Sequence, residues 1–230
     1  MSYRIKLSRS PLILAAFVAA AVACGSDTEN VLPPVGTQLS IKEGSDAQTG
    51  AAGSALTQPI SVHVTDASGT ASSGTTVTWT VATGGGTTSA ATSVTNATGD
   101  ATTTWTLGTT AGANTVTASI PAGASVTIHA TATAAAAATV TKVSGDAQTI
   151  AVGTASVPLV IKVVDQYGNP VSGATVAWTS TGGGTLTSMT VTDADGQAPA
   201  MLTADVVPAA YTVTATVGTL TPVTFTITAN

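Results

Sequence analysis

Apolar and polar residues alternate with a period of two along most of the chain after residue 37. In residues 126–130 (VTIHA) and 223–227 (VTFTI) every second side chain is apolar, and Thr or His stands between. Residues 75–81 and 212–217 alternate in the same way. This alternation is typical of strands that bury one face. We find no i, i+3, i+4, i+7 stripe after residue 37, so the pattern predicts short strands throughout.

The sequence also repeats itself at offsets of 97 to 100 residues. The clearest matches are 44–49 (GSDAQT) with 144–149 (SGDAQT), 84–87 (GGGT) with 182–185, and 115–118 (TVTA) with 212–215. A period this long exceeds that of solenoid repeats and indicates a duplicated domain. With Gly, Asn-Pro and Asp-Gly turn signals between the strands, we predict an all-β fold of two tandem immunoglobulin-like antiparallel β-sandwiches. They occupy residues 38–134 and 135–230.

The first 23 residues follow a different pattern. Arg4, Lys6 and Arg9 precede an uncharged, mostly apolar stretch over residues 11–23. As a helix this stretch would span about 20 Å at ~1.5 Å per residue, less than the ~30 Å hydrocarbon core of a bilayer. Residues 1–23 are therefore predicted to be a cleaved signal peptide.

Residues 21–26 (AVACGS) resemble the lipobox of bacterial lipoproteins. The resemblance implies that Cys24 is lipidated on its thiol and becomes the first residue after cleavage. Residues 24–37, polar and then interrupted by Pro, would form a lipidated flexible tether. Gly25 stands where inner-membrane lipoproteins carry Asp, so the resemblance favours the outer membrane. The alternative is an ordinary signal peptide cleaved after Ala23, which would leave a free thiol.

Charge narrows the range of partners. Only 7% of residues are charged, and without residues 1–23 three lysines face all eleven acidic residues. Such a surface offers no basic stripe, which excludes nucleic-acid binding and electrostatic attachment to anionic lipid.

Two segments of the second repeat resemble a known family. Residues 165–178 (DQYGNPVSGATVAW) and 192–198 (TDADGQA) are similar to the two signatures of bacterial immunoglobulin-like domains of the intimin and invasin type (group 1). The first repeat is weaker, because 66–71 (DASGTA) lacks the Asn-Pro. The resemblance implies tandem sandwiches that space or present something at a cell surface.

Several acidic residues could form sites. Asp193 and Asp195 have the spacing of a calcium loop, but the first repeat has residues 96–99 (NATG) there and lacks both carboxylates, so a turn is favoured. Asp66 and Asp165 each precede a Gly by three residues and are also interpreted as turn residues.

The remaining candidates are interpreted as structural. His63 and His129 fall on the outward phase of strands, with nothing gathered around either, and we predict surface residues. Trp79 and Trp178 share phase with apolar neighbours and Trp105 aligns with Leu202, so all three are predicted core residues. The Gly-rich segments lack the Lys and the helix of a phosphate loop.

No nucleophile, base and orienting residue occur together, and no metal or cofactor is implied. We expect a non-enzymatic, lipid-anchored protein of the cell envelope that acts as a surface spacer, presentation or adhesion module, attached through Cys24 to the outer membrane or cell surface. The alternative is a ligand-binding module, for a glycan or a protein, that uses loops of the distal domain, where Tyr167 is the one aromatic residue in a plausible loop.

Overall fold

The computed structural model describes residues 35–230. The predicted signal peptide, Cys24 and most of the tether lie outside the described residues. Residues 35–230 contain strands, turns and loops, and none of them forms a helix long and apolar enough to cross a bilayer. The prediction of an all-β fold is confirmed.

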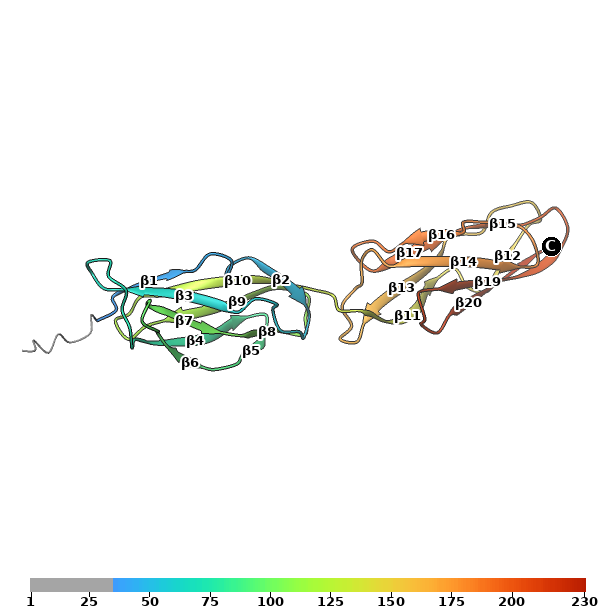
Figure 1. Cartoon of the computed structure of the whole chain (residues 1–230). Helices are drawn as coiled ribbons and strands as arrows, with labels where there is room; N and C mark the ends of the chain where they lie inside the picture. Colours follow the sequence, from blue (N-terminus) through green and yellow to red (C-terminus); the bar gives the residue numbers. More distant parts are fainter. Residues whose placement is uncertain (1–34) are drawn as a thin grey trace, which may run out of the picture. The chain divides into compact units, whose positions relative to one another are not determined.

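The first sandwich has a three-stranded sheet in the order β1-β3-β7, a five-stranded sheet in the order β2-β10-β9-β4-β6, and a small β5-β8 pair (Figure 1). Its strands are β1 (Gln38–Ile41), β2 (Gln48–Ala51), β3 (Ile60–Thr65), β4 (Thr76–Thr83), β5 (Gly86–Thr88), β6 (Thr92–Val94), β7 (Asp100–Thr103), β8 (Trp105–Leu107), β9 (Gly112–Ser119) and β10 (Ser125–Thr133).

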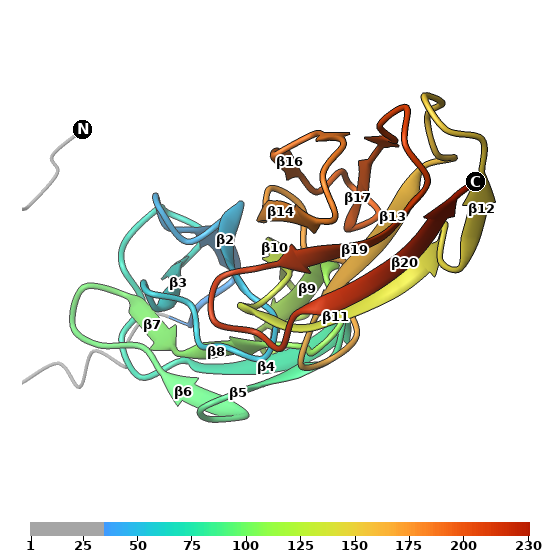
Figure 2. The ribbon, with the colours of Figure 1, turned by 90° about the vertical axis from the view of Figure 1, so that its right-hand side faces the viewer.

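The second sandwich repeats this topology, with sheets β11-β13-β17 and β12-β20-β19-β14-β16 and a β15-β18 pair. Its strands are β11 (Ala137–Ser144), β12 (Gln148–Ile150), β13 (Leu159–Asp165), β14 (Thr175–Thr181), β15 (Thr185–Leu186), β16 (Met189–Val191), β17 (Gln197–Ala200), β18 (Leu202–Thr203), β19 (Ala209–Thr216) and β20 (Val223–Ala229). Figure 2 shows β19 and β20 side by side, with the C-terminus at the end of β20.

One pairing in each sandwich departs from the predicted antiparallel arrangement. Strand β2 runs parallel to β10, and β12 runs parallel to β20. The cause is a corner at which the chain leaves one sheet and joins the other, between β1 and β2 and again between β11 and β12. At these corners Ala47 and Ala147 have φ of 56° and 53°, a left-handed backbone conformation that residues other than Gly, Asn and Asp seldom adopt.

An aspartate stabilises each corner. Oδ1 of Asp46 accepts a hydrogen bond of 2.7 Å from the backbone N–H of His129, and Oδ1 of Asp146 accepts one of 2.9 Å from that of Thr226. The strongest repeat in the sequence, the segment that ends in DAQT, therefore encodes this sheet-switching corner.

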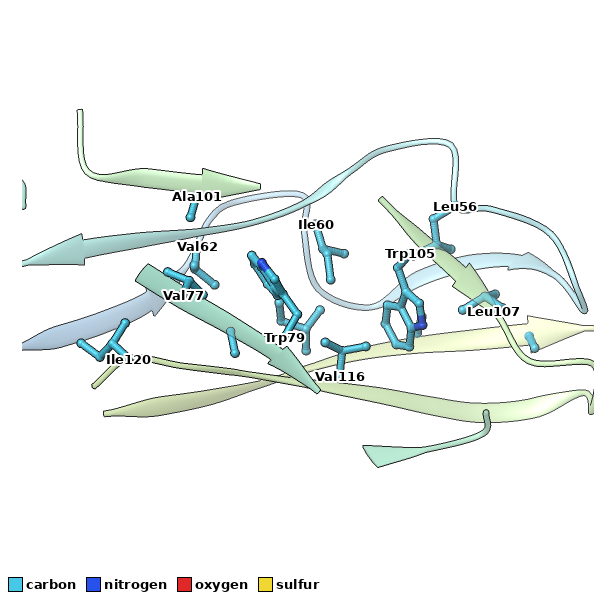
Figure 3. Packing of buried hydrophobic residues seen from close by; sticks show 14 of the residues in the cluster. Leu56, Ile60, Val62, Val77, Trp79, Ala101, Trp105, Leu107, Val116 and Ile120 are labelled. Carbon is cyan, nitrogen blue, oxygen red and sulfur yellow. The ribbon is translucent and has the colours of Figure 1, made fainter. Parts of the chain in front are cut away.

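Alternation along the strands places the core between the two sheets. Strand β3 buries every second residue, and Trp79 and Trp178 are each 3% exposed (Figure 3 shows the first sandwich). The indole N–H groups of both donate to a hydroxyl on the edge strand beside them: Trp79 to Ser93 at 2.9 Å, and Trp178 to Thr190 at 2.8 Å.

One end of each core is filled by an aromatic ring that comes from a different strand in each copy. In the first sandwich the ring is that of Trp105 on β8, surrounded by Leu56, Leu107 and Val116 (Figure 3). In the second it is Tyr211 on β19, whose hydroxyl accepts a hydrogen bond of 3.0 Å from the backbone N–H of Asp205. The set Leu56, Trp105 and Asn114 of the first sandwich corresponds to Ser156, Leu202 and Tyr211 in the second.

This exchange keeps the core filled while it changes which residue supplies the bulk. Asn114 and Tyr211 each accept a hydrogen bond from the same backbone position. Oδ1 of Asn114 accepts one of 3.2 Å from the N–H of Gly108, and the Tyr211 hydroxyl accepts one from the N–H of Asp205, the residue equivalent to Gly108. Each copy thus pairs one large ring with one smaller residue.

Moving the ring to the other strand tests this relation. Tyr211→Asn should lower the free energy of unfolding of the second sandwich by about 3–5 kcal/mol, because it leaves a cavity. Leu202→Trp alone should cost about 1–3 kcal/mol through overcrowding. The triple variant that adds Ser156→Leu copies the first sandwich and should recover much of both losses in urea unfolding followed by NMR. Strictly additive losses would contradict the relation.

Candidate interaction surfaces

The loops after β3 and β13 are organised by one carboxylate oxygen. Oδ1 of Asp66 accepts the backbone N–H groups of Ser68 and Thr70 at 2.8 and 2.9 Å. Oδ1 of Asp165 accepts those of Tyr167 and Asn169 at the same two distances. Both aspartates are therefore turn residues, as the sequence indicates.

The ionised form of each aspartate is stabilised by these loops. The pKa of Asp66 lies below its usual value, mainly because the Ser68 hydroxyl donates to it. Burial opposes ionisation of Asp165, but hydrogen bonds from Asn169, Ala135 and Tyr167 outweigh it and hold the pKa below its usual value.

The turns at residues 193–197 and 96–100 are organised in the same way, and only one of them has a carboxylate in this place. Oδ1 of Asp193 accepts the N–H groups of Asp195 and Gln197 at 2.9 and 2.8 Å. In the first sandwich Oδ1 of Asn96 accepts those of Thr98 and Asp100, both at 2.9 Å. A neutral amide thus does the work of the carboxylate, which supports the turn interpretation over a calcium loop. Within residues 35–230 no three His, Cys, Asp or Glu side chains gather as a metal site would require.

Each histidine contacts an aspartate, so the prediction that nothing gathers around either was wrong. Nδ1 of His63 lies 2.9 Å from Asp100, which also accepts a hydrogen bond of 2.7 Å from Lys42. Lys42 is the main cause that lowers the pKa of Asp100 to about 2, with His63 contributing. Nδ1 of His129 lies 3.2 Å from Asp46.

The His63–Asp100 pair lies on the outward face of two paired strands, whereas His129 contacts the corner residue Asp46. His63 stands opposite Asp100 in the β3–β7 ladder, and the same positions in the second sandwich hold Lys162 and Gln197. The group formed by Asp100, His63 and Lys42 therefore occurs only in the first copy. In the second copy the equivalent cross-strand pair is Lys162 and Gln197.

The tryptophans and the Gly-rich segments are accounted for by packing. Trp105 is fully buried, and its indole N–H has no partner among the described residues. Gly86 has φ of 87°, and a Cβ atom there would lie 2.2 Å from the carbonyl oxygen of Thr106. Gly86 therefore begins β5 tight against β8, where it pairs with Leu107.

Exposed apolar side chains gather at one end of the second sandwich. Val206 and Val207 are 81% and 65% exposed. Val206 and Val207 border an open depression of about 630 Å³ whose other lining residues are Gly153, Gly182, Ala204, Asp205 and Ala209. We call this surface the Val206 end. The first sandwich has Thr109 and Thr110 at the two exposed loop positions.

Comparisons with known proteins agree with this fold. Residues 138–229 match the bacterial Ig-like domain family (group 1). No curated protein matches the sequence.

Among solved structures, the Escherichia coli adhesin FdeC is 21% identical with a TM-score of 0.53, over 82% of this chain and 63% of that one. Yersinia pseudotuberculosis InvD is 16% identical with a TM-score of 0.50, over 84% of this chain and 56% of that one. The D0–D1 domain of intimin is 22% identical over 83% of this chain and 98% of that one, with a TM-score of 0.34. The second sandwich thus matches the bacterial Ig-like domain family (group 1), and the first sandwich repeats its topology.

Proposed function

We propose that this chain is a non-enzymatic adhesion or surface module of the bacterial envelope, in which a lipid on Cys24 holds two Ig-like sandwiches. The observation that carries the proposal is the repeat itself. Both copies build a complete core, and the aspartates that they share accept hydrogen bonds from backbone N–H groups at turns and corners. The aspartates present in both copies therefore have structural roles, and in this proposal the outer faces of the sandwiches are used for spacing or contact.

The match of residues 138–229 to bacterial Ig-like domains supports the same function. FdeC, which has this fold, is described as an adhesin. In this proposal residues 1–23 direct export, the lipid fixes the protein to the outer membrane, and the sandwiches lie on the cell surface.

Replacing the lipidated residue tests the anchor and the location together. Cys24→Ser should move the protein from the membrane fraction to the soluble fraction and abolish labelling by a radioactive fatty acid, since the thiol that accepts the lipid is gone. In cells with the unaltered chain, added protease should remove the sandwiches without lysis. A periplasmic protein of similar size serves as the control that must stay intact.

Two results would contradict this proposal. A Cys24→Ser chain that remained in the membrane fraction would disprove the lipid anchor. Sandwiches that protease reached only after the outer membrane was opened would place them in the periplasm.

A second function, binding of a protein or glycan ligand, is favoured by the Val206 end. Val206 and Val207, adjacent and exposed, border a depression and form an apolar surface there. Ligand-binding surfaces commonly combine exposed apolar groups with a few polar ones, and Asp205 supplies a carboxylate here. Tyr167, the aromatic residue expected in such a site, belongs to the loop after β13 and does not line this depression.

Serine substitutions test the Val206 end. The double variant Val206→Ser/Val207→Ser should lose at least tenfold in binding to a glycan array or to immobilised cell-surface protein, with an unchanged melting temperature because both side chains are exposed. The matched control is the double variant Val94→Ser/Val191→Ser, which replaces two similarly exposed valines outside the Val206 end. Equal binding by both double variants and the unaltered chain would rule out the Val206 end as the binding surface.

A further inference from the structure

Asp165 has a second oxygen that does more than its turn requires. Oδ1 closes the turn, as it does in Asp66. Oδ2 accepts hydrogen bonds of 2.8 Å from the side-chain amide of Asn169 and of 2.8 Å from the backbone N–H of Ala135. Ala135 belongs to the three residues between β10 and β11, so this carboxylate ties the segment joining the sandwiches to the loop after β13.

The amide of Asn169 extends this network to the first sandwich. Its Nδ2 donates to the carbonyl oxygen of Thr109 at 2.8 Å, and its Oδ1 accepts from the N–H of Ala111 at 2.9 Å. Asn169 is 7% exposed and Asp165 is 2% exposed. A planar amide that offers one donor and one acceptor to the same loop fixes both distance and orientation.

Tyr167 adds a steric contact to these hydrogen bonds. A Cβ atom at Gly53 would lie 2.3 Å from the Tyr167 hydroxyl oxygen, so the ring end occupies a space that only Gly leaves open. The loop of residues 165–170 therefore contacts two loops of the first sandwich, one around Gly53 and one at residues 109–111.

The internal repeat supplies its own comparison. The loop after β3 keeps the turn but has Ser68 in place of Tyr167 and Thr70 in place of Asn169, and both are exposed. Residues 24–37, the predicted tether, precede that sandwich. At the Val206 end, Pro208 replaces Ala111, and proline has no N–H to donate. Among these equivalent loops, the Asn side chain and the backbone N–H group that donates to it therefore occur together only at the junction, as Asn169 and Ala111.

We propose that the loop of residues 165–170 is a docking surface for the end of a preceding Ig-like sandwich, which Asn169 recognises through backbone atoms of residues 109–111. Recognition through backbone atoms depends on the shape of the receiving loop and little on its side chains. The docking surface therefore fits the loop end of a sandwich of this topology that leaves one carbonyl and one N–H free. This inference stands independently of whether the chain acts in adhesion.

The test replaces Asn169 by the residue of the first repeat. Asn169→Thr keeps a side chain that this turn accommodates in the loop after β3, and it removes both hydrogen bonds to the first sandwich. The chain is expressed without residues 1–23 and with Cys24→Ser. Asn169→Ala is the second variant, and Thr70→Ala, in the equivalent loop, is the matched control.

Two NMR measurements report on the junction. The amide proton of Ala111 should exchange at least tenfold faster in both Asn169 variants, while amides in β13 and β19 exchange as in the unaltered chain. Residual dipolar couplings of the two sandwiches should fit a single alignment tensor in the unaltered chain and in Thr70→Ala, and should need two tensors in the Asn169 variants.

The outcomes are decisive because folding is monitored separately by the amides of β13 and β19. Unchanged Ala111 exchange together with a single tensor in both Asn169 variants would overturn the proposal. Two tensors in the unaltered chain would overturn it as well.

Discussion

A backbone N–H group that is not used in strand pairing bonds either to water or to a side-chain oxygen, and a side-chain oxygen at that place also fixes the turn or corner. The strands here are short, and they turn or change sheets often, so such groups recur at fixed places. Side-chain oxygens accept hydrogen bonds from these N–H groups at the corners and at the turns. The residues are Asp46 and Asp146 at the corners, and Asp165, Asp193 and Asn96 at the turns. The fold of a chain with few charges depends on where these acceptors stand.

The same constraint gives the repeated acidic residues a structural role in both copies. An Asp oxygen that accepts two backbone N–H groups has little capacity left for a metal or a proton in transit. Where one oxygen remains free, as in Asp165, it accepts further N–H donors from the neighbouring segment and from Asn169.

The alternation of apolar and polar residues predicted the strands, because each strand buries one face, and the internal repeat predicted two sandwiches. Contacts that depend on register were not predicted. His63 meets Asp100 across β3 and β7, and His129 meets Asp46 from 83 positions away, which no local pattern reveals. The parallel β2–β10 and β12–β20 pairs were missed for the same reason. A signal for the junction was present in the sequence, since Tyr167 and Asn169 differ from Ser68 and Thr70 at equivalent places, but its meaning required the contacts.

The parallel pairs have a mechanical consequence. In the second sandwich β12 follows the entry strand β11 and β20 is the last strand, and β12 and β20 run in the same direction. A force that draws the ends of this sandwich apart therefore loads their hydrogen bonds along the strand axis, so that the bonds share the load and must fail together. An antiparallel terminal pair pulled from one edge would open one bond at a time. The corner that moves the chain from one sheet to the other thus sets how the domain resists tension.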